Sequence, residues 1–272
     1  MEGNCAYCFK YRPLMKSHAI PRAAFKAMLA GKGNAIGIPY GDGNAHLTSD
    51  SGDAPLLCDL CEQQFNRDFD GPLTNALKSL ENEILVNGFR GSITFDSDQL
   101  AHSIVSIAWR ICQSPAHMYS EVNLSGIHRA ELDRLMRLPS KRILQDCTVR
   151  IGRLSDGRPV GSGGFDQKLM NQFIKAPEAH SIRLKPHRKA KHFAMDWTMF
   201  GFLIHLVVPR LPYAKRKEFG GLKSKTTRIR AMPVDIFKYR PVVDALVAGY
   251  AAKEDGRLSP SLKKRETRKS KG

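Results

Sequence analysis

Two Cys-x-x-Cys pairs near the N-terminus constrain this chain more than any other feature. The first pair is Cys5 and Cys8, and the second is Cys58 and Cys61. Two residues between cysteines let both thiolates reach one ion from a tight turn, and two such turns complete a tetrahedron. The spacing therefore predicts a four-cysteine zinc site. The 49 residues between the pairs predict an insertion carried by the same module.

A closed shell of four thiolates leaves no open coordination position, so we expect this zinc to be structural and not catalytic. The alternatives are four free cysteines or a redox-active pair. Two pairs in one chain favour zinc over both alternatives. The other two cysteines, Cys112 and Cys147, stand alone in apolar segments and are predicted to be core residues.

Positive charge is concentrated in the last third of the chain. The net charge is +17 over 272 residues, but residues 1–182 contribute only +1. Residues 183–230 carry 13 basic and 2 acidic side chains, and residues 253–272 carry 8 basic and 3 acidic ones. Lysines and arginines that meet phosphates release condensed counterions, so this asymmetry favours a nucleic-acid partner over a merely solvated surface.

The densest basic clusters are the predicted nucleic-acid contacts: Arg188, Lys189, Lys191, Lys215, Arg216 and Lys217. Gly220 and Gly221 follow the second cluster closely, which predicts a flexible basic loop that closes over a duplex.

Composition places the chain among ordinary globular proteins. A hydrophobic content of 42% excludes wholesale disorder. No run approaches the ~18 apolar residues of a membrane span, and the start lacks the basic-then-apolar order of a signal peptide. We therefore expect a cytoplasmic protein without a membrane partner.

The predicted fold class is α+β. We expect a zinc module over residues 1–85, a mixed α+β domain with a basic surface over 86–252, and a basic disordered tail over 253–272. The five glycines of 152–164 predict a loop or hinge. Residues 193–208 are apolar and interrupted by Gly201, which predicts either two core strands or one strand with a bulge.

Helices are predicted from apolar periodicity and capping residues. One follows Pro21, and another begins at Asp96 or Ser97 and continues through Ile111. Two more are expected over 126–138 and 240–253. A helix after Cys58 is expected to stop near Gly71 and Pro72, with a separate helix following it.

The N-terminal quarter resembles a known family. Cys5-x-x-Cys8, then Ser17-His18-Ala19-Ile20-Pro21, then Leu56-Leu57-Cys58-x-x-Cys61-Glu62 is similar to the zinc-stabilised branch of the HNH endonucleases. The resemblance covers residues 5–70 and implies a ββα-metal, treble-clef-like hairpin and helix.

The resemblance also implies a set of catalytic residues. His18 would be the general base that takes a proton from water attacking a DNA phosphodiester. Asp53 and Glu62 would hold Mg²⁺ or another divalent cation, for which carboxylates are suitable ligands. The family's usual residues at the positions of Ser17, Asp53 and Glu62 are Asp, Asn, and His or Asn, so the sequence departs from the pattern around His18.

Three functions are compatible with these residues. The first is a hydrolase, an HNH-type DNA endonuclease that uses His18 and a divalent metal. The second keeps the zinc site and the DNA binding but lacks cleavage, leaving a zinc-finger-like nucleic-acid-binding protein. The third is a protein-interaction module clipped by zinc, whose basic surface docks an acidic protein.

Overall fold

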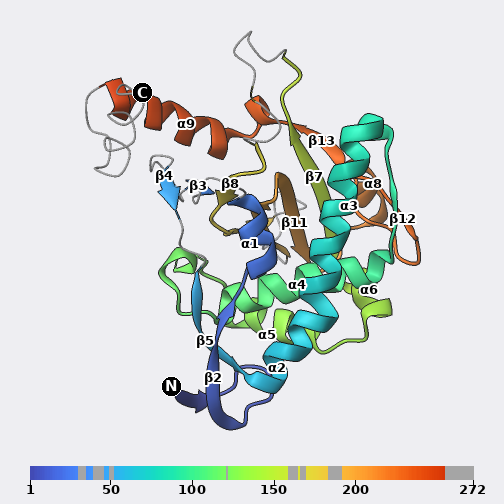
Figure 1. Cartoon of the computed structure of the whole chain (residues 1–272). Helices are drawn as coiled ribbons and strands as arrows, with labels where there is room; N and C mark the ends of the chain where they lie inside the picture. Colours follow the sequence, from blue (N-terminus) through green and yellow to red (C-terminus); the bar gives the residue numbers. More distant parts are fainter. Residues whose placement is uncertain are drawn as a thin grey trace.

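The computed structural model describes residues 1–29, 35–38, 46–48, 52–120, 122–158, 165, 170–182 and 192–254. The chain is a mixed α+β protein with a cysteine cluster near its N-terminus, as the sequence predicts. Figure 1 shows the N-terminal strands at the lower end of the molecule, a larger sheet above them, and α4, α5 and α6 between the two. The predicted tail beyond residue 254 lies outside the described residues.

The N-terminal module is a small antiparallel sheet followed by a helix. The strands are β1 (Glu2–Asn4), β2 (Tyr11–His18) and β5 (Asp53–Cys58), in the order β1-β2-β5. Helix α1 (Arg22–Met28) follows Pro21, and α2 (Asp59–Phe65) begins directly after β5. Between them lie β3 (Ala35–Ile38) and β4 (His46–Thr48), which belong to the predicted insertion.

A five-stranded sheet forms the centre of the rest of the chain, in the order β13-β7-β11-β10-β9. Its pairs are antiparallel except for β13 with β7. The strands are β7 (Thr148–Ser155), β9 (Glu178–Ile182), β10 (His192–Met199), β11 (Phe202–Val208) and β13 (Met232–Asp235). The short strands β6 (Ile93–Thr94), β8 (Phe173–Lys175) and β12 (Arg228–Ile229) pair outside this sheet, β12 with β6 and β8 with β3.

The prediction of two core strands over 193–208 is confirmed. Strands β10 and β11 form a hairpin whose turn residues, Phe200 and Gly201, have φ angles of 54° and 72°. Two successive residues in the left-handed region make the tight turn that matches the twist of paired strands. Trp197 is fully buried in the hairpin.

Most predicted helices are present at their expected positions. They include α4 (Ser97–Gln113), α5 (Gly126–Met136) and α9 (Arg240–Glu254). The shorter helices α6 (Ile143–Asp146) and α8 (Tyr213–Phe219) were not predicted. The carboxylate of Asp96 caps α4 by accepting from the backbone N–H groups of Asp98 and Gln99. Helix α4 is buried on nearly all sides, so it is the central helix of the fold.

The predicted stop near Gly71 and Pro72 is wrong. Helix α2 continues through a π-helical turn over residues 66–70 into α3 (Gly71–Asn87). Pro72 lacks the N–H that a helix would direct towards the carbonyl of Asp68. The side chain of Gln99 donates to that carbonyl instead, at 2.5 Å, so a partner distant in sequence supports the uninterrupted helix.

The predicted loop over 152–164 is also wrong at its start, because β7 extends to Ser155. Gly152 lies inside this strand, where an added Cβ would come within 2.4 Å of the Val234 side chain on β13. The glycine therefore permits close packing of two parallel strands and does not mark a loop. Residues 159–164 lie outside the described residues.

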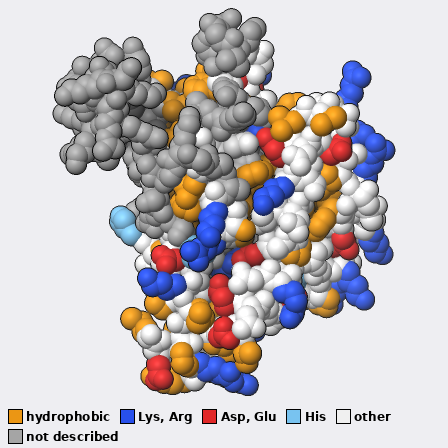
Figure 2. Space-filling view, in the orientation of Figure 1, with side chains coloured by type: hydrophobic (Ala, Val, Ile, Leu, Met, Phe, Trp, Pro, Cys, Tyr) orange, Lys and Arg blue, Asp and Glu red, His pale blue; other side chains and the backbone are white. Residues whose placement is uncertain are grey.

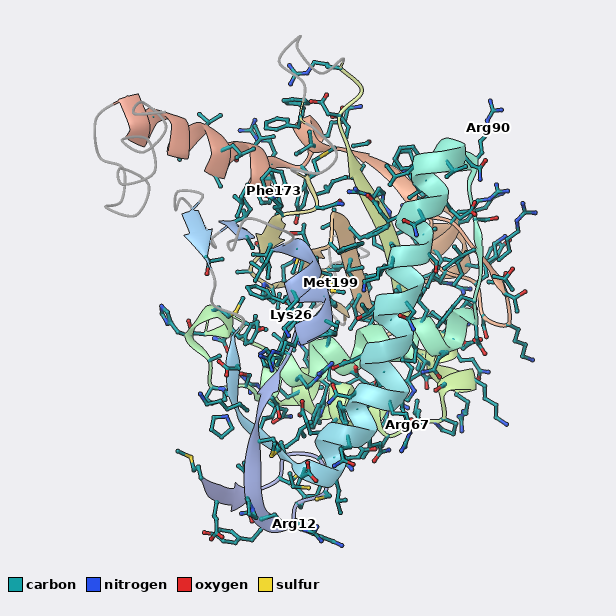
Figure 3. All side chains as sticks on the ribbon, viewed as in Figure 1. Arg12, Lys26, Arg67, Arg90, Phe173 and Met199 are labelled. Carbon is teal, nitrogen blue, oxygen red and sulfur yellow. The ribbon has the colours of Figure 1, made fainter. Side chains whose placement is uncertain are left out.

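The largest hydrophobic core lies between α4 and one face of the five-stranded sheet. Side chains of β10 at Phe193, Met195 and Met199 belong to it, together with Ile104 of α4. A second core on the other side contains Phe173, and Figure 3 shows Phe173 and Met199 in the interior of the molecule. None of the described helices is long and apolar enough to cross a membrane.

Three buried cations are each paired with a carboxylate. Arg110 of α4 forms a bidentate pair with Asp70, and one of its two contacts is 3.0 Å long. The other two pairs join Arg153 with Glu81, at 2.6 Å, and Lys175 with Asp196, at 3.0 Å. A buried charge without its partner is strongly destabilising, so these pairs fix how the helices and the sheet pack together.

We predict that Asp70→Asn destabilises the protein by about 3–5 kcal/mol, because it leaves Arg110 buried without its counter-charge. Urea unfolding monitored by circular dichroism measures this free energy. Asp68→Asn is the matched control, since it breaks the exposed pair with Arg67 and should cost less than about 1 kcal/mol. Equal losses in the two variants would contradict the proposed importance of the buried pair.

Candidate metal centre and hydrolytic site

The four predicted zinc ligands converge on one point. The sulfur atoms of Cys5, Cys8, Cys58 and Cys61 all lie within 4.8 Å of one another. Cys5 and Cys8 flank the turn between β1 and β2, whereas Cys58 ends β5 and Cys61 lies in the first turn of α2. The fold thus joins the N-terminal turn to the start of α2 through these thiols.

The spacing of the sulfur atoms fits a tetrahedral metal ion. Zinc–sulfur bonds of about 2.3 Å place the corners of a tetrahedron about 3.8 Å apart. The Sγ atoms of Cys8 and Cys58 are 3.8 Å apart. Cys5, Cys58 and Cys61 are buried, so their thiols are shielded from solvent. The cluster is therefore consistent with a structural zinc site.

Backbone N–H groups favour the thiolate form of Cys5. Burial alone would raise the pKa of Cys5, but backbone hydrogen bonds from Cys8, Cys58 and Tyr7 lower this pKa to about 7. One of them is the N–H of Cys58, which donates to the Cys5 sulfur at 3.3 Å. In contrast, burial raises the pKa of Cys61, where the neighbouring thiols add to the effect. A bound cation would offset the cost of placing several negative sulfurs together and would hold all four as thiolates.

Aromatic side chains attach the cysteine module to the central helix. The ring of Tyr7 packs edge-on against Phe65, at 5.0 Å between centroids, and against Trp109 of α4, at 5.9 Å. The guanidinium of Arg137 lies over the rings of both Tyr7 and Phe9. These contacts couple the folding of the metal centre to that of α4.

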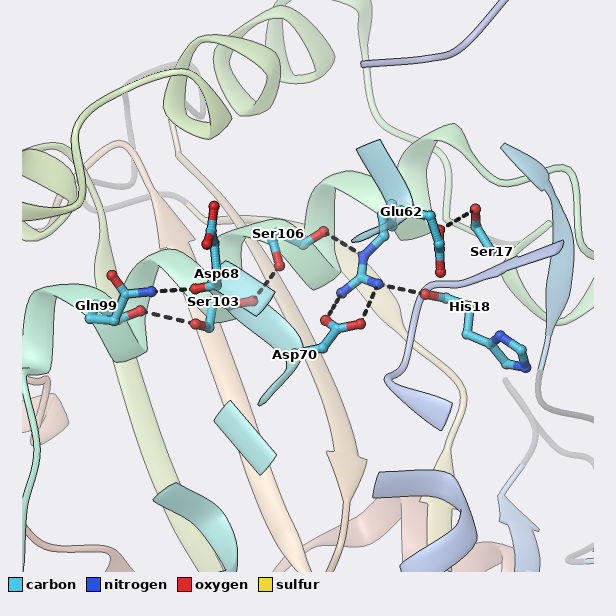
Figure 4. A network of polar contacts seen from close by, with 9 residues as sticks. Ser17, His18, Glu62, Asp68, Asp70, Gln99, Ser103 and Ser106 are labelled. Carbon is cyan, nitrogen blue, oxygen red and sulfur yellow. Dashed lines mark hydrogen bonds and ion pairs between the residues drawn. The ribbon is translucent and has the colours of Figure 1, made fainter. Parts of the chain in front are cut away.

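His18 lies at the end of β2, four residues along the strand from Leu14, which pairs with Cys58. It pairs directly with Asp53, the first residue of β5, across the antiparallel ladder. Its side chain is half-buried, and its backbone carbonyl accepts a 2.8 Å hydrogen bond from Arg110. Because Arg110 is in turn held by Asp70, the backbone at His18 is tied to the core through two links, which Figure 4 draws as dashed lines.

Glu62 enters the same region from the first turn of α2. Its Oε2 atom accepts a 2.6 Å hydrogen bond from the hydroxyl of Ser17, the residue before His18. The same hydroxyl oxygen accepts from the backbone N–H of Leu57 at 3.2 Å. Ser17 therefore holds Glu62 against β2. Figure 4 draws this contact as a dashed line and shows the His18 ring to the lower right, away from the Glu62 carboxylate.

Burial and the nearby carboxylates act on the pKa of His18 in opposite directions. Burial lowers the pKa of His18, and the carboxylates of Asp53 and Glu62 oppose that effect by raising it. Arg22 and Arg110 act in the same direction as burial. The net result is a His18 pKa below its ordinary value, so the imidazole is neutral at pH 7 and able to accept a proton.

The three groups do not form a closed ligand set. Among the described residues, the four cysteines are the one group of three or more metal-binding side chains whose ligand atoms all lie within 4.8 Å. His18, Asp53 and Glu62 approach one another without meeting this spacing. Asp53 is also exposed, whereas Glu62 is half-buried.

The predicted nucleic-acid contacts fall into two groups. Lys215, Arg216 and Lys217 lie on α8, so the predicted flexible loop is wrong at these positions. Gly220 ends α8 in the left-handed conformation, with φ of 71°, and is a helix cap. Figure 2 shows basic side chains along the right-hand edge of the molecule, where Figure 1 places α8 and β12. Arg188, Lys189 and Lys191 lie outside the described residues.

Two residues that hold the site were not predicted. Arg110 and Asp70 support His18 from α4 and from the π-helical turn, which are distant in sequence. The one signal in the sequence was an arginine within the apolar pattern of 97–113, since a charge in such a helix needs a partner.

Comparisons of the chain with protein-family models, with curated proteins and with solved structures find no match.

We predict that the purified protein contains about one equivalent of zinc by elemental analysis. Cys58→Ala should lose this zinc and unfold the N-terminal module, because a structural zinc contributes on the order of 10 kcal/mol to folding. Cys112→Ala removes a buried thiol outside the cluster and should keep the full zinc content. A metal-free wild-type protein with an intact module would contradict the assignment.

Proposed function

We propose that this protein is a zinc-stabilised DNA endonuclease of the HNH type, with His18 as its general base. The observation that supports the proposal most is the placement of His18, Asp53 and Glu62 on the paired strands β2 and β5 and on α2. His18 lies opposite Asp53 and close enough to Glu62 for both carboxylates to affect its pKa. These are the positions to which the resemblance assigns the base and the cation ligands.

The chemistry assigned to His18 is proton abstraction from water. The neutral imidazole takes the proton as the water oxygen attacks phosphorus, and the bond from phosphorus to the leaving oxygen breaks in line. The lowered pKa of His18 keeps its imidazole in the neutral form that can accept a proton, although it also makes the imidazole a weaker base.

Asp53 and Glu62 are the residues that would hold a divalent cation. Ser17 engages only the Oε2 atom of Glu62, and Oε1 makes no hydrogen bond to a described residue. Carboxylate oxygens of this kind suit Mg²⁺, which would supply charge stabilisation at the scissile phosphate when bound. Asp53 is exposed, so it can turn towards such an ion at little cost.

We predict that the wild-type protein nicks supercoiled plasmid with Mg²⁺ and that His18→Ala is at least about 100-fold slower, because it lacks the base. Gel electrophoresis of the plasmid over time measures the rate. His117→Ala is the matched control, since it removes an exposed histidine outside the module. Nicking by His18→Ala at the wild-type rate would reject the proposed base.

A second function is favoured by one specific feature. The hydroxyl of Ser17, at a position where the family pattern has an Asp, donates to Glu62 at 2.6 Å. His18, Asp53 and Glu62 are also wider apart than the ligands of a closed metal site. This arrangement suits a zinc-finger-like module that binds nucleic acid without cleaving it. Salt-sensitive DNA binding in a wild-type protein that never nicks DNA would select this function over the first.

A further inference from the structure

A pocket of about 430 Å³ lies between the five-stranded sheet and α8, outside the N-terminal module. Arg150 of β7 lines one wall, and Lys215 and Lys217 of α8 line the other. An apolar surface that includes Phe219 and Met232 completes the pocket. Such a combination of cations and apolar side chains suits a ligand with an anionic group on an apolar or aromatic body.

Positive charge dominates this pocket. Its one carboxylate is Glu218, which is already paired with Lys215 at 2.8 Å on the surface. Arg150 and Lys217 make no ion pair with a described residue. The pocket therefore presents two cations whose charge is not compensated among the described residues.

Two buried polar atoms without hydrogen-bond partners among the described residues lie on β7 and β11, close to the Phe219 ring. The Nε atom of Arg150 is buried and has no hydrogen-bond partner among the described residues. The same holds for Nε2 of His205, which lies directly opposite Arg150 on β11. Both side chains contact the Phe219 ring, Arg150 with its guanidinium 5.4 Å from the centroid. The Nε–H group of Arg150 is a donor in every protonation state, and an anion would satisfy it.

Burial disfavours the charged forms of both Arg150 and His205. Burial lowers the pKa of Arg150. Burial also lowers the pKa of His205, to about 4, and Arg150 adds to this effect although Asp196 opposes it. Groups in such a region gain most from a bound negative charge.

We propose that this pocket binds a phosphorylated nucleotide unit, with its phosphate between Arg150 and Lys217 and its base against the apolar wall at Phe219. The sequence segment 183–230, to which α8 belongs, carries 13 basic and 2 acidic side chains, which favours a nucleic-acid source for the nucleotide.

The proposal shares its nucleic-acid partner with the proposed function but does not depend on cleavage. The test is isothermal titration of the full chain with thymidine 5′-monophosphate, without added Mg²⁺. We expect saturable binding, with thymidine at least about tenfold weaker because it lacks the phosphate. A 5′-phosphorylated hexanucleotide in the same titration distinguishes a strand from a free nucleotide, since a strand binds more tightly and loses affinity steeply with salt.

Two variants locate the binding. Arg150→Gln and Lys217→Gln should each weaken binding of the monophosphate by about tenfold, because each removes a charge-assisted contact. Lys217 is exposed, so its variant remains informative if Arg150→Gln unfolds. Lys78→Gln, on the exposed face of α3 and outside the pocket, is the matched control and should bind within about twofold of wild type.

Three results would overturn the proposal: no binding of the monophosphate, equal binding of thymidine, or equal losses in Lys217→Gln and Lys78→Gln. Octanoate binding more tightly than the monophosphate would also overturn it, because the pocket would then take an apolar carboxylate. If the protein nicks plasmid but fails these titrations, the pocket proposal is rejected and the proposed nuclease function stands. If it binds the monophosphate but never nicks plasmid, the nuclease function is rejected and the pocket proposal stands.

Discussion

The buried pair between Arg110 and Asp70 is the contact on which the candidate site depends. Moving two charges out of water is expensive, so such a pair is stable only with good geometry and further hydrogen bonds. Arg110 meets this requirement by donating also to the carbonyls of His18 and Ser106. One side chain of α4 thereby fixes both the π-helical turn and the end of β2. The position of His18 is thus set by the central helix as well as by the pairing of β2 with β5.

The cysteine cluster and the candidate hydrolytic residues are adjacent in the chain, and this adjacency explains how one could support the other. Cys58 ends the strand that Asp53 begins, and Glu62 directly follows Cys61. A metal ion held by the four thiols would cross-link the start of α2 to the turn between β1 and β2. The carboxylates and His18 would then be presented from a rigid frame, as a pre-organised site requires.

Features encoded by residues close together in sequence could be predicted, and features that depend on distant partners could not. The zinc spacing of Cys58 and Cys61, the Gly201 turn and the Asp96 cap are all local, and the structure contains each of them. The continuous helix at Pro72 depends on Gln99, and the strand at Gly152 depends on Val234. Within the candidate site, the resemblance gave His18 and Glu62 but not Arg110, whose partners are 40 and 92 residues away.

Anomalous X-ray scattering from crystals grown with Mn²⁺ tests the central claim most directly, because it locates each metal by its absorption edge. Two separate peaks are expected. A zinc peak should lie among Cys5, Cys8, Cys58 and Cys61, and a manganese peak should lie at the carboxylates of Asp53 and Glu62, near His18. A zinc peak alone, with no manganese beside His18, would contradict the endonuclease and leave a zinc-stabilised binding module.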